Sequence, residues 1–504
     1  MTEDNANWSR RSALKGLAAA AGAIPLLGCP LPAAAAPLAK KHGEAVGEGA
    51  GGEAMLTGRL VFPKDPGYDT ARAGWDALFS SYPQVVVFCQ STGDVVNALT
   101  YARENDIDFR VRGGRHSLEG WSSVDDGIVI DISALKSISI DLEAKTATVG
   151  TGLNQGELVN ALAKTPFAFP TGDEATVGLG GVTLGGGIGV LAPRMGLACD
   201  NLLAVEIVIP AGRSGARVVR ADLEQHSDLL WACRGGGGGN FGIATSYEFQ
   251  IHDMPETVGI WQVTWPFSAL EGAFDTWQRW APSADVRLGS TFEADTPIDG
   301  LKVNGVFLGP PDQVQEMVEP LLKVSGAQFQ SSASTWVDHY NADNAIPDPY
   351  RSWKFTPMWA PQPIPREGID VVRDMLTRAP SRGCTFWALG WGGAVRKPPP
   401  GGAAWFWRDP IFYAEPGAGW NGAEGNGAHI AWIEQFRNAM RPYAGGGYVN
   451  VPDRAIEDWG TAYYGTHFDR LRVIKRRYDP HEVFSFEQSI PPADLFGDKP
   501  IITK

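Results

Sequence analysis

The amino-acid sequence predicts an α+β protein in two parts, and three observations carry this prediction. Before about residue 255, short apolar strands alternate with helices and with three glycine-rich stretches. After that point, longer strands with alternating aromatic residues dominate, and helices lie between them. Strands and helices in this second order indicate a large antiparallel sheet covered by helices on one face. The length of 504 residues is enough for one large domain or two ordinary ones.

The composition is that of a globular protein and argues against some classes of function. Apolar residues make up 44% of the chain and charged residues 20%, and the net charge is −14. An acidic chain argues against a general nucleic-acid binder, which carries a basic face. The five cysteines show no CxxC spacing, so we expect no metal cluster. Cys89 and Cys233 lie in apolar segments and are predicted to be buried thiols.

The N-terminus carries the pattern of an export signal. Arg10 and Arg11 form a twin-arginine pair, and residues 16–27 after it are an apolar run that is too short to span a membrane. This pattern predicts a twin-arginine signal peptide over residues 1–36 and a periplasmic or extracellular protein.

The end of this signal has two interpretations. Residues 26–29 resemble a lipoprotein box, which would place a lipid anchor on Cys29, whereas residues 33–36 offer an ordinary cleavage site. Residues 37–54 are rich in Ala, Gly and Lys and predict a flexible linker. No later apolar stretch is long enough for a transmembrane helix.

The first part of the chain opens with short elements that are defined by their apolar spacing. Residues 84–89 form an apolar run typical of a buried strand, and residues 92–105 carry apolar positions at helical spacing. A strand at residues 107–111 then leads into a glycine loop. The elements that follow the loop are a strand at residues 127–131, a hairpin of residues 137–141 and 146–149, and a helix at residues 155–162.

The loop after residue 111 has the composition of an anion site. Gly113 and Gly114 are followed by Arg115, His116 and Ser117. Glycines let backbone amides approach a ligand closely, and a row of such amides forms a concave site for an anion. The loop therefore suits a cofactor that carries a pyrophosphate, although a Gly-Gly pair between strands is on its own an ordinary turn.

A second glycine-rich stretch lies within residues 170–203, with seven glycines between Gly178 and Gly189. This density predicts neither a helix nor a regular sheet, but backbone that lies against something large and flat, or turns that pack closely. The stretch lacks the Gly-Lys-Ser/Thr of a P-loop and a GxGxxG pattern. Strands at residues 204–210, 217–220 and 246–251 follow, with a third glycine cluster at residues 235–239.

The second part of the chain is dominated by aromatic strands. Most of these aromatic side chains are expected in a rigid core, and a fraction would line a pocket for a planar or sugar-like ligand. The predicted elements are strands at residues 259–265, 301–308 and 384–391, helices at 311–322 and 368–376, an aromatic strand with turns at 405–420, a helix at 464–477, and a closing segment at 484–490.

These stretches together resemble the berberine-bridge-enzyme-like branch of the vanillyl-alcohol-oxidase flavoprotein superfamily, whose FAD-binding domain is of the PCMH type. The motifs that carry the resemblance occur in the family's order: Arg112–Ser117, Gly185–Gly189, Gly196–Asn201, Arg234–Gly242 and Tyr463–Ile490. The resemblance implies an FAD-binding domain of two α/β subdomains at residues 55–254 and a substrate-binding domain at 255–447. A C-terminal segment, residues 448–504, is expected to return to the FAD-binding domain.

The resemblance also implies the cofactor site. His116 takes the position of the histidine that bonds covalently to the flavin 8α carbon, and no metal is expected. The other residues placed at the FAD by the family's motifs are Arg112, Gly113, Gly114, Arg115, Ser117, Thr176, Val177, Gly178, Gly181, Gly186, Gly187, Gly189, Asn201, Gly242, Ile243, Tyr464 and His467.

Four positions depart from the family's pattern. Arg115 precedes His116 where relatives have glycine, and an arginine there is able to pair with a phosphate or ribose. Glu174 stands where many relatives have a cysteine that forms a second link to the flavin, so a single covalent bond is expected. His467 replaces an asparagine close to the flavin, and Val451 replaces a tyrosine that acts as the base.

The resemblance implies an exported FAD-dependent oxidase. Such an enzyme takes a hydride from a hydroxyl- or amine-bearing molecule, such as a secondary metabolite, an aromatic alcohol or a carbohydrate, and passes the electrons to O2 with formation of H2O2. Val177 takes a position near the flavin edge where valine is associated with oxygen access. The alternatives are a dehydrogenase with a non-oxygen acceptor, and a protein that sequesters its ligand without turnover. The expected state is a monomer or a homodimer.

Four side chains are candidates for the catalytic base. Glu415 ranks first, because desolvation of a carboxylate among aromatic residues would raise its pKa toward the working pH. Tyr448 ranks second, because strand alternation would place it on the face opposite Val451. His467 is expected to act more as a hydrogen-bond donor at the flavin edge, and Tyr464 lies on the same motif.

Overall fold

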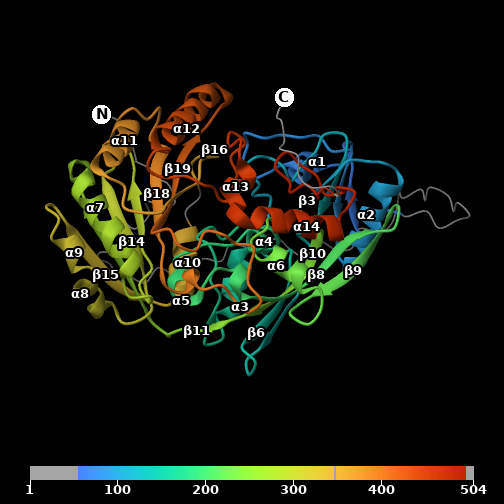
Figure 1. The fold of residues 1–504 in the computed structure, drawn as a ribbon, viewed down its shortest axis with the longest axis horizontal. Helices are drawn as coiled ribbons and strands as arrows, with labels where there is room; N and C mark the ends of the chain where they lie inside the picture. The colour runs from blue at the N-terminus through green and yellow to red at the C-terminus, as the bar shows by residue number, and fades with distance from the viewer. Residues whose placement is uncertain (1–54, 346–347, 495–504) are drawn as a thin grey trace, which may run out of the picture.

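The structure, a computed structural model, describes residues 55–345 and 348–494. The predicted export signal, the linker and Cys29 lie outside the described residues. The chain forms two lobes that lie side by side (Figure 1). The first lobe holds a four-stranded and a five-stranded sheet, and the second holds an eight-stranded antiparallel sheet. The predicted α+β class is therefore confirmed.

The four-stranded sheet of the first lobe is built around buried parallel strands. Its order is β1-β2-β4-β3, with β2 and β3 parallel to β4 and β1 antiparallel to β2. Helix α2 connects β2 to β3 and begins with a capping box, in which Ser91 and Asp94 each accept a bond from the other's backbone amide. The elements are β1 Arg59–Val61, α1 Tyr68–Arg72, β2 Val85–Phe88, α2 Thr92–Glu104, β3 Phe109–Arg112 and β4 Ile128–Asp131.

The five-stranded sheet is antiparallel, in the order β5-β6-β10-β8-β9. Helix α3 begins with a capping box of Asn154 and Glu157, and its bounds agree with the helix predicted at residues 155–162. The elements are β5 Ile138–Asp141, β6 Thr146–Gly150, α3 Gln155–Leu162, β8 Leu202–Ala211, β9 Gly215–Ala221, α6 Ser227–Cys233 and β10 Ile243–Gln250. A separate two-stranded sheet pairs β7 Phe167–Ala168 with β11 His252–Asp253.

The prediction that the second glycine-rich stretch holds no helix is wrong. Two short helices lie within it, α4 Leu179–Leu184 and α5 Ala192–Met195. Gly180 lies in α4, and a Cβ there would be 3.0 Å from the Thr151 carbonyl oxygen. The glycine thus lets α4 pack against the neighbouring backbone, and the close approach offsets its poor helix propensity.

The second lobe is organised by the eight-stranded sheet, in the order β15-β12-β14-β13-β18-β19-β16, with β17 also paired to β19. The alternating aromatic runs form its central strands, as predicted. The strands are β12 Val258–Trp265, β13 Thr291–Ala294, β14 Leu301–Phe307, β15 Gln328–Ser334, β16 Ser352–Phe355, β17 Met358–Ala360, β18 Cys384–Gly390 and β19 Phe412–Trp420.

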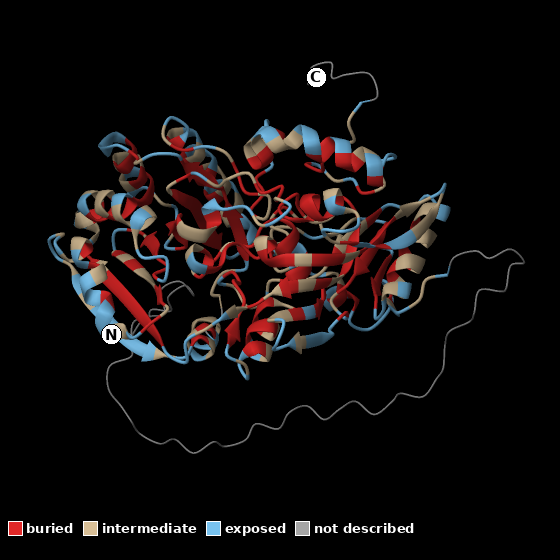
Figure 2. Ribbon diagram, turned by 60° about the horizontal axis from the view of Figure 1, so that its bottom comes forward, coloured by how far each residue is buried: buried red, intermediate tan, exposed pale blue. Residues whose placement is uncertain are grey.

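Strand alternation gives this sheet two different faces. In β18 and β19, Phe386 and Phe412 point to a core formed with the covering helices, whereas Trp387 and Tyr413 point to a separate aromatic cluster on the other face. Buried residues line the strands and the inner faces of the helices, and exposed residues lie outside (Figure 2). The covering helices are α7 Leu270–Trp280, α11 Arg366–Thr377 and α12 Asn426–Met440.

Two predicted helices are interrupted. The helix predicted at residues 311–322 is a short 3-10 turn followed by α8 Val314–Met317 and α9 Glu319–Leu322, because Pro320 opens a new first turn. The helix predicted at 464–477 is divided at Gly465, which has a φ of 50°, into α13 Trp459–Tyr464 and α14 Phe468–Tyr478. Helix α10, Trp336–Asn344, lies between the lobes.

The C-terminal helices α13 and α14 lie on the first lobe, where α14 packs next to α6 (Figure 1). Lys475 of α14 is fully buried, and its Nζ donates to the carbonyls of Asn240 and Phe484 and to the carboxylate of Asp479, each at 2.7 Å. A buried ammonium with this many partners is satisfied rather than destabilising. The bond to Asn240 ties the C-terminal segment to the end of the third glycine cluster, and the other two bonds lie within that segment.

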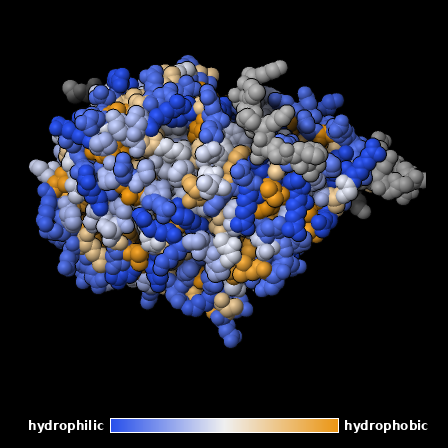
Figure 3. Space-filling view, in the orientation of Figure 1, coloured by the Kyte–Doolittle hydropathy of each residue, from blue (hydrophilic) through white to orange (hydrophobic). Residues whose placement is uncertain are grey.

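The surface and the cysteines agree with a globular, acidic protein. The face in Figure 3 is largely hydrophilic, with separate hydrophobic patches. Within residues 55–345 and 348–494, no helix is both long and apolar enough to cross a membrane, and no group of His, Cys, Asp and Glu side chains could hold a metal ion. Cys89 and Cys233 are buried free thiols, as predicted, and so are Cys199 and Cys384.

Candidate active site

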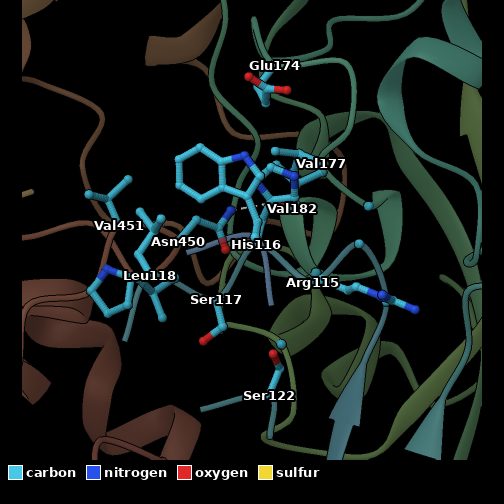
Figure 4. A pocket seen from close by; sticks show the side chains of 18 of the residues that line it. Arg115, His116, Ser117, Leu118, Ser122, Glu174, Val177, Val182, Asn450 and Val451 are labelled. Atoms are coloured by element: carbon cyan, nitrogen blue, oxygen red, sulfur yellow. Dashed lines mark hydrogen bonds between the residues drawn. The ribbon is translucent and has the colours of Figure 1, made fainter. Parts of the chain in front are cut away.

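A cavity of about 460 Å³ joins the two lobes. The loop after β3, with His116, and the second glycine-rich stretch form its walls in the first lobe. The aromatic face of the large sheet, including Trp387 and Glu415, and the C-terminal segment around Tyr448 complete it. Figure 4 shows side chains of the His116 loop, of the second glycine-rich stretch and of the C-terminal segment around one space. The volume lies within the range of cofactor and substrate sites.

Two glycine loops meet backbone to backbone at this cavity. A Cβ on Gly114 would lie 2.1 Å from the Gly178 nitrogen, and one on Gly178 would lie 2.4 Å from the Gly114 nitrogen. Both positions therefore require glycine. Gly181 also lines the cavity, but a Cβ there would meet no described atom within 4 Å. The result is a wall of bare backbone that faces open space, which a large flat ligand could approach closely.

His116 is held by two neighbours. Its ring stacks on Trp75, with the centroids 4.9 Å apart and an interplanar angle of 26°, and its Nε2 lies 2.9 Å from the Thr176 hydroxyl. The preceding residue, Arg115, has a φ of 67°, which turns the chain so that the histidine faces the cavity. The guanidinium of Arg115 donates to the Thr70 carbonyl at 2.9 Å and also lines the cavity.

The loop that carries Glu174 and Thr176 is fixed by helix α3. The buried side chain of Gln155 accepts a bond from the Gly172 amide and donates to the Glu174 carbonyl. The backbone amide of Gln155 donates to the Val177 carbonyl at 2.9 Å. Gln155 was not among the predicted site residues, because a glutamine at the start of a helix carries no pattern that distinguishes it from a surface residue.

The predicted cofactor residues divide into two groups in the structure. Those that line the cavity are Gly113, Gly114, Arg115, His116, Ser117, Val177, Gly178, Gly181, Gly242 and Ile243. Those outside this lining are Arg112, Thr176, Gly186, Gly187, Gly189, Asn201, Tyr464 and His467. Thr176 is exposed and contacts the His116 ring, whereas the other seven lie behind the lining, so that their predicted contact with the cofactor needs correction.

The residues behind the lining have structural partners. Arg112 is buried, pairs with Asp131 at 2.8 Å and donates to two carbonyls of α1. Asn201 donates to the carbonyls of Met195 and Leu197. Their motif positions therefore serve the packing of the loops.

The glycines of the GGGIG motif also pack against protein. A Cβ on Gly186 would lie 2.4 Å from the Trp405 ring, a Cβ on Gly187 would lie 2.5 Å from the Ala198 side chain, and a Cβ on Gly189 would lie 2.0 Å from the Thr171 carbonyl oxygen. These glycines shape the wall from behind.

Tyr464 and His467 do not reach the cavity. The Tyr464 hydroxyl is buried and donates to the Gly236 carbonyl at 3.1 Å. The His467 Nδ1 lies 3.1 Å from the Ala404 carbonyl, and its ring packs edge-on against Trp231 and Phe406. The break at Gly465 turns this segment toward the core of the first lobe, so neither residue is retained as a base.

Glu415 reaches the cavity through the register of β19. Glu415 pairs with Trp387 in the neighbouring strand and shares the aromatic face with Tyr413, two residues earlier. The Tyr413 hydroxyl donates to Glu415 Oε2 at 2.9 Å. The residue is only 6% exposed, which makes Glu415 a buried acid on the large-sheet side of the cavity.

Tyr448 and Val451 both line the cavity, so the prediction that they lie on opposite faces is wrong. The chain turns between them, with the Val451 amide donating to the Tyr448 carbonyl at 2.9 Å. The Tyr448 hydroxyl oxygen accepts bonds from the Gly187 amide at 3.0 Å and from Asn450 Nδ2 at 2.9 Å. Burial raises the pKa of Tyr448 well above its ordinary value, against the lowering effect of these two bonds.

A buried cluster of charges beside the cavity connects the lobes. Lys354 of β16 pairs with Glu119 of the His116 loop and lies 3.3 Å from Asp453 of the C-terminal segment. Arg454 also bonds Glu119, at 2.8 Å. The neighbours of these residues, Trp353, Phe355 and Pro452, line the cavity. No local pattern indicates this cluster, because its members are far apart in the chain.

The fold and cavity fit a flavin dinucleotide. The bare glycine wall admits a pyrophosphate, and the aromatic face opposite it leaves space for a flat ring system. A model of the FAD binding domain matches residues 83–214. The fold and site thus define an FAD-linked oxidoreductase.

The particular family follows from the C-terminus and from whole-chain relatives. A berberine and berberine-like model matches residues 447–491. The chain is 43% identical over 450 residues to YvdP of Bacillus subtilis (strain 168), an uncharacterised FAD-linked oxidoreductase, across 88% of this chain and 100% of YvdP. The chain therefore belongs to the berberine-bridge-enzyme-like family of FAD-linked oxidoreductases.

Solved structures share this architecture over nearly their whole length. BBE-like 1 of Physcomitrella patens is 27% identical with a TM-score of 0.81, over 87% of this chain and 98% of that one. The glycopeptide hexose oxidase DBV29, solved in complex with teicoplanin, is 25% identical with a TM-score of 0.77, over 86% of this chain and 99% of that one. The predicted PCMH-type fold is confirmed.

Proposed function

We propose that the protein is an exported FAD-dependent oxidase of a hydroxyl- or amine-bearing organic molecule. The observation that carries the proposal is the convergence of Glu415 and Tyr448 on the same cavity as His116. Glu415 is a buried acid, Tyr448 is a buried phenol, and the glycine wall would hold the flavin. These groups suit the transfer of a hydride to the flavin from a C–H bond next to O–H or N–H. The relative that is named a hexose oxidase supports this class of substrate.

FAD would be joined to the protein by one bond, through His116. The histidine lies at the glycine wall, and Glu174 stands where a second, cysteinyl link would have to form. A carboxylate cannot form a thioether, and Cys199 is buried behind the lining. Residues Gly113, Gly114, Gly178 and Gly181 would hold the dinucleotide through their backbone.

When bound, the flavin supplies the hydride acceptor. Glu415 would accept the proton of the substrate hydroxyl or amine, because it is a buried carboxylate that lines the cavity and the Tyr413 hydroxyl holds its orientation. Tyr448 suits a different role. Its oxygen accepts two hydrogen bonds, so the neutral phenol has only its own hydrogen left to give, and it would orient the substrate as a donor.

Molecular oxygen is the acceptor that Val177 favours. Val177 lines the cavity beside the His116 loop, and a branched side chain of modest size leaves room that a larger residue would fill (Figure 4). The alternative of a non-oxygen acceptor is tested by the same experiment as the oxidase proposal.

The test separates the three functions with the purified protein. Its flavin is reduced by light in the presence of EDTA, mixed with air-saturated buffer, and followed by absorbance, while peroxide is measured. An oxidase regains its yellow form within seconds and yields peroxide, whereas slow reoxidation contradicts the oxygen assignment. A panel of alcohols, sugars and amines is then screened for anaerobic bleaching of the flavin. Binding of a panel member without bleaching would favour sequestration.

Export rests on the N-terminal sequence. The twin-arginine pair supports delivery to the periplasm or beyond, and Arg10→Lys together with Arg11→Lys should retain the precursor in the cytoplasm. Cell fractionation checks this, and unchanged export of the double variant would contradict the assignment.

A further inference from the structure

Three side chains form a hydrogen-bonded row beside the glycine wall. The Nε2 of His116 lies 2.9 Å from the Thr176 Oγ1, and the Thr176 hydroxyl donates to Glu174 Oε1 at 2.6 Å. Glu174 lines the cavity together with His116 (Figure 4). The row therefore runs from an acidic side chain, through a hydroxyl, to the histidine.

The number of hydrogens that Thr176, Glu174 and His116 have to donate determines which nitrogen of His116 carries its hydrogen. A threonine hydroxyl has one hydrogen, and Thr176 donates it to Glu174 Oε1, so this hydrogen is committed to Glu174. The Thr176 oxygen can then only accept at its other contact. The His116 Nε2 must be the donor, and in the neutral ring Nδ1 therefore keeps its lone pair.

The geometry of the row is fixed by its surroundings. Gln155 holds the backbone of Glu174, and the contact between Gly114 and Gly178 fixes the distance between the two loops. The stacked ring of Trp75 fixes the plane of the His116 ring. The three polar groups are therefore set at bonding distance by the fold itself.

We propose that Thr176 and Glu174 are positioning residues for flavin attachment: they hold His116 as the Nε2–H tautomer, so that Nδ1 forms the bond to the flavin. This inference rests on the proposed covalent bond at His116. It assigns a role to the glutamate that occupies the cysteine position.

The attachment step balances with dioxygen as the only co-reactant. The lone pair of Nδ1 forms the new bond to the 8α carbon, one methyl proton moves to the flavin ring, and the ring carries the two electrons of its reduced form. The imidazole meanwhile carries a positive charge, with its hydrogen still on Nε2. Dioxygen then takes two electrons and two protons, one from the ring and one from Nε2, and leaves as hydrogen peroxide.

Thr176 and Glu174 assist this step by stabilising the positive charge that forms on the His116 imidazole. The imidazole becomes positive as the bond forms, and Nε2–H then donates to an oxygen that is itself polarised by the Glu174 carboxylate. Hydrogen bonds that involve a charged partner are stronger than neutral ones, and removing one corresponds to a rate loss of roughly tenfold or more. Thr176 is exposed, so solvent weakens the effect in the absence of cofactor.

The test uses the whole protein and measures attachment, not turnover. Wild type, Thr176→Val, Thr176→Ser and Glu174→Gln are produced with limiting riboflavin, purified, and incubated with FAD in air. The covalent fraction is read over time as flavin fluorescence that remains with the denatured polypeptide. Total flavin, bound in either way, is read from the absorbance of the native protein.

Valine keeps the shape of threonine and lacks the hydroxyl, whereas serine keeps the hydroxyl and changes the shape. The inference predicts that Thr176→Val attaches flavin roughly tenfold more slowly or worse, that Thr176→Ser stays near wild type, and that Glu174→Gln is slowed while total flavin is retained. Wild-type attachment rates in Thr176→Val, or a loss in Thr176→Ser alone, would overturn it. A wild type whose flavin leaves on denaturation would overturn the covalent bond itself and this inference with it.

Discussion

Gly181 and Gly114 both line the cavity, and alanine at these two positions should change the stability of the flavin-free protein in opposite directions. A Cβ on Gly181 would meet no described atom within 4 Å, so the apoprotein accommodates it. Gly181 lies in helix α4, where alanine is favoured over glycine by about 1 kcal/mol. Gly181→Ala should therefore raise the free energy of unfolding of the flavin-free protein by up to that amount.

The same methyl group would occupy the space that we assign to FAD. Overpacking of a close contact costs about 1–3 kcal/mol, which is roughly a 5- to 150-fold loss of affinity. Flavin occupancy should fall at limiting FAD although the fold is more stable. Gly114→Ala is the matched control, because its Cβ would lie 2.1 Å from the Gly178 nitrogen, about 1.3 Å short of ordinary contact, and should destabilise the flavin-free protein.

Guanidinium unfolding and the flavin-to-protein absorbance ratio, measured on protein from riboflavin-starved cells with and without added FAD, separate the two effects. Gly181→Ala with wild-type flavin occupancy would refute the placement of FAD against this wall. Equal unfolding of Gly114→Ala and wild type would refute the backbone contact.

Three further predictions concern acceptor, base and pH. Val177→Leu should slow reoxidation of the photoreduced flavin in air and leave anaerobic reduction unchanged; equal reoxidation rates in stopped flow would count against Val177. Glu415→Gln should slow anaerobic flavin reduction by a substrate found in the screen by roughly 10²- to 10⁴-fold, with Tyr448→Phe affected less; an unaffected Glu415→Gln would eliminate Glu415 as the base. Burial raises the pKa of Asp76 from 3.8 to about 6, so the folded state keeps a proton that the unfolded state has lost, and stability falls as pH rises through this window. The free energy of unfolding of Asp76→Asn minus that of wild type, measured in urea, should accordingly rise by up to about 3 kcal/mol between pH 4 and pH 7. A difference that stays constant over this range would contradict the assignment.

The fold was predictable where local patterns agree with the final structure. Helix α3 starts after Asn154 because a capping box defines its first turn, and that signal is complete within four residues. The buried strand β2 and the aromatic strands of the large sheet were readable for the same reason. Helix α4 was not, because glycine in a helix is favoured only by a neighbour, here Thr151, that local sequence does not reveal.

The placement of the site was predictable in part. A glycine motif indicated the His116 loop and an aromatic strand indicated Glu415, and both line the cavity, while their roles stay predictions. Tyr464 and His467 lie outside the cavity lining, because the directions of the side chains on either side of Gly465 depend on a turn that the motif does not encode. Trp75, which stacks on His116, lies outside every motif and became visible only through the tertiary contact.

The central claim is that the glycine-walled cavity holds one FAD joined to the protein at His116. Mass spectrometry of the intact, acid-denatured protein tests this claim directly, with wild type and His116→Ala compared after expression in the presence of riboflavin. We predict that wild type carries the added mass of one FAD and that His116→Ala has the mass of the polypeptide alone, although flavin is bound before denaturation. A wild type with no added mass, or a His116→Ala variant that keeps the added mass, would contradict the account.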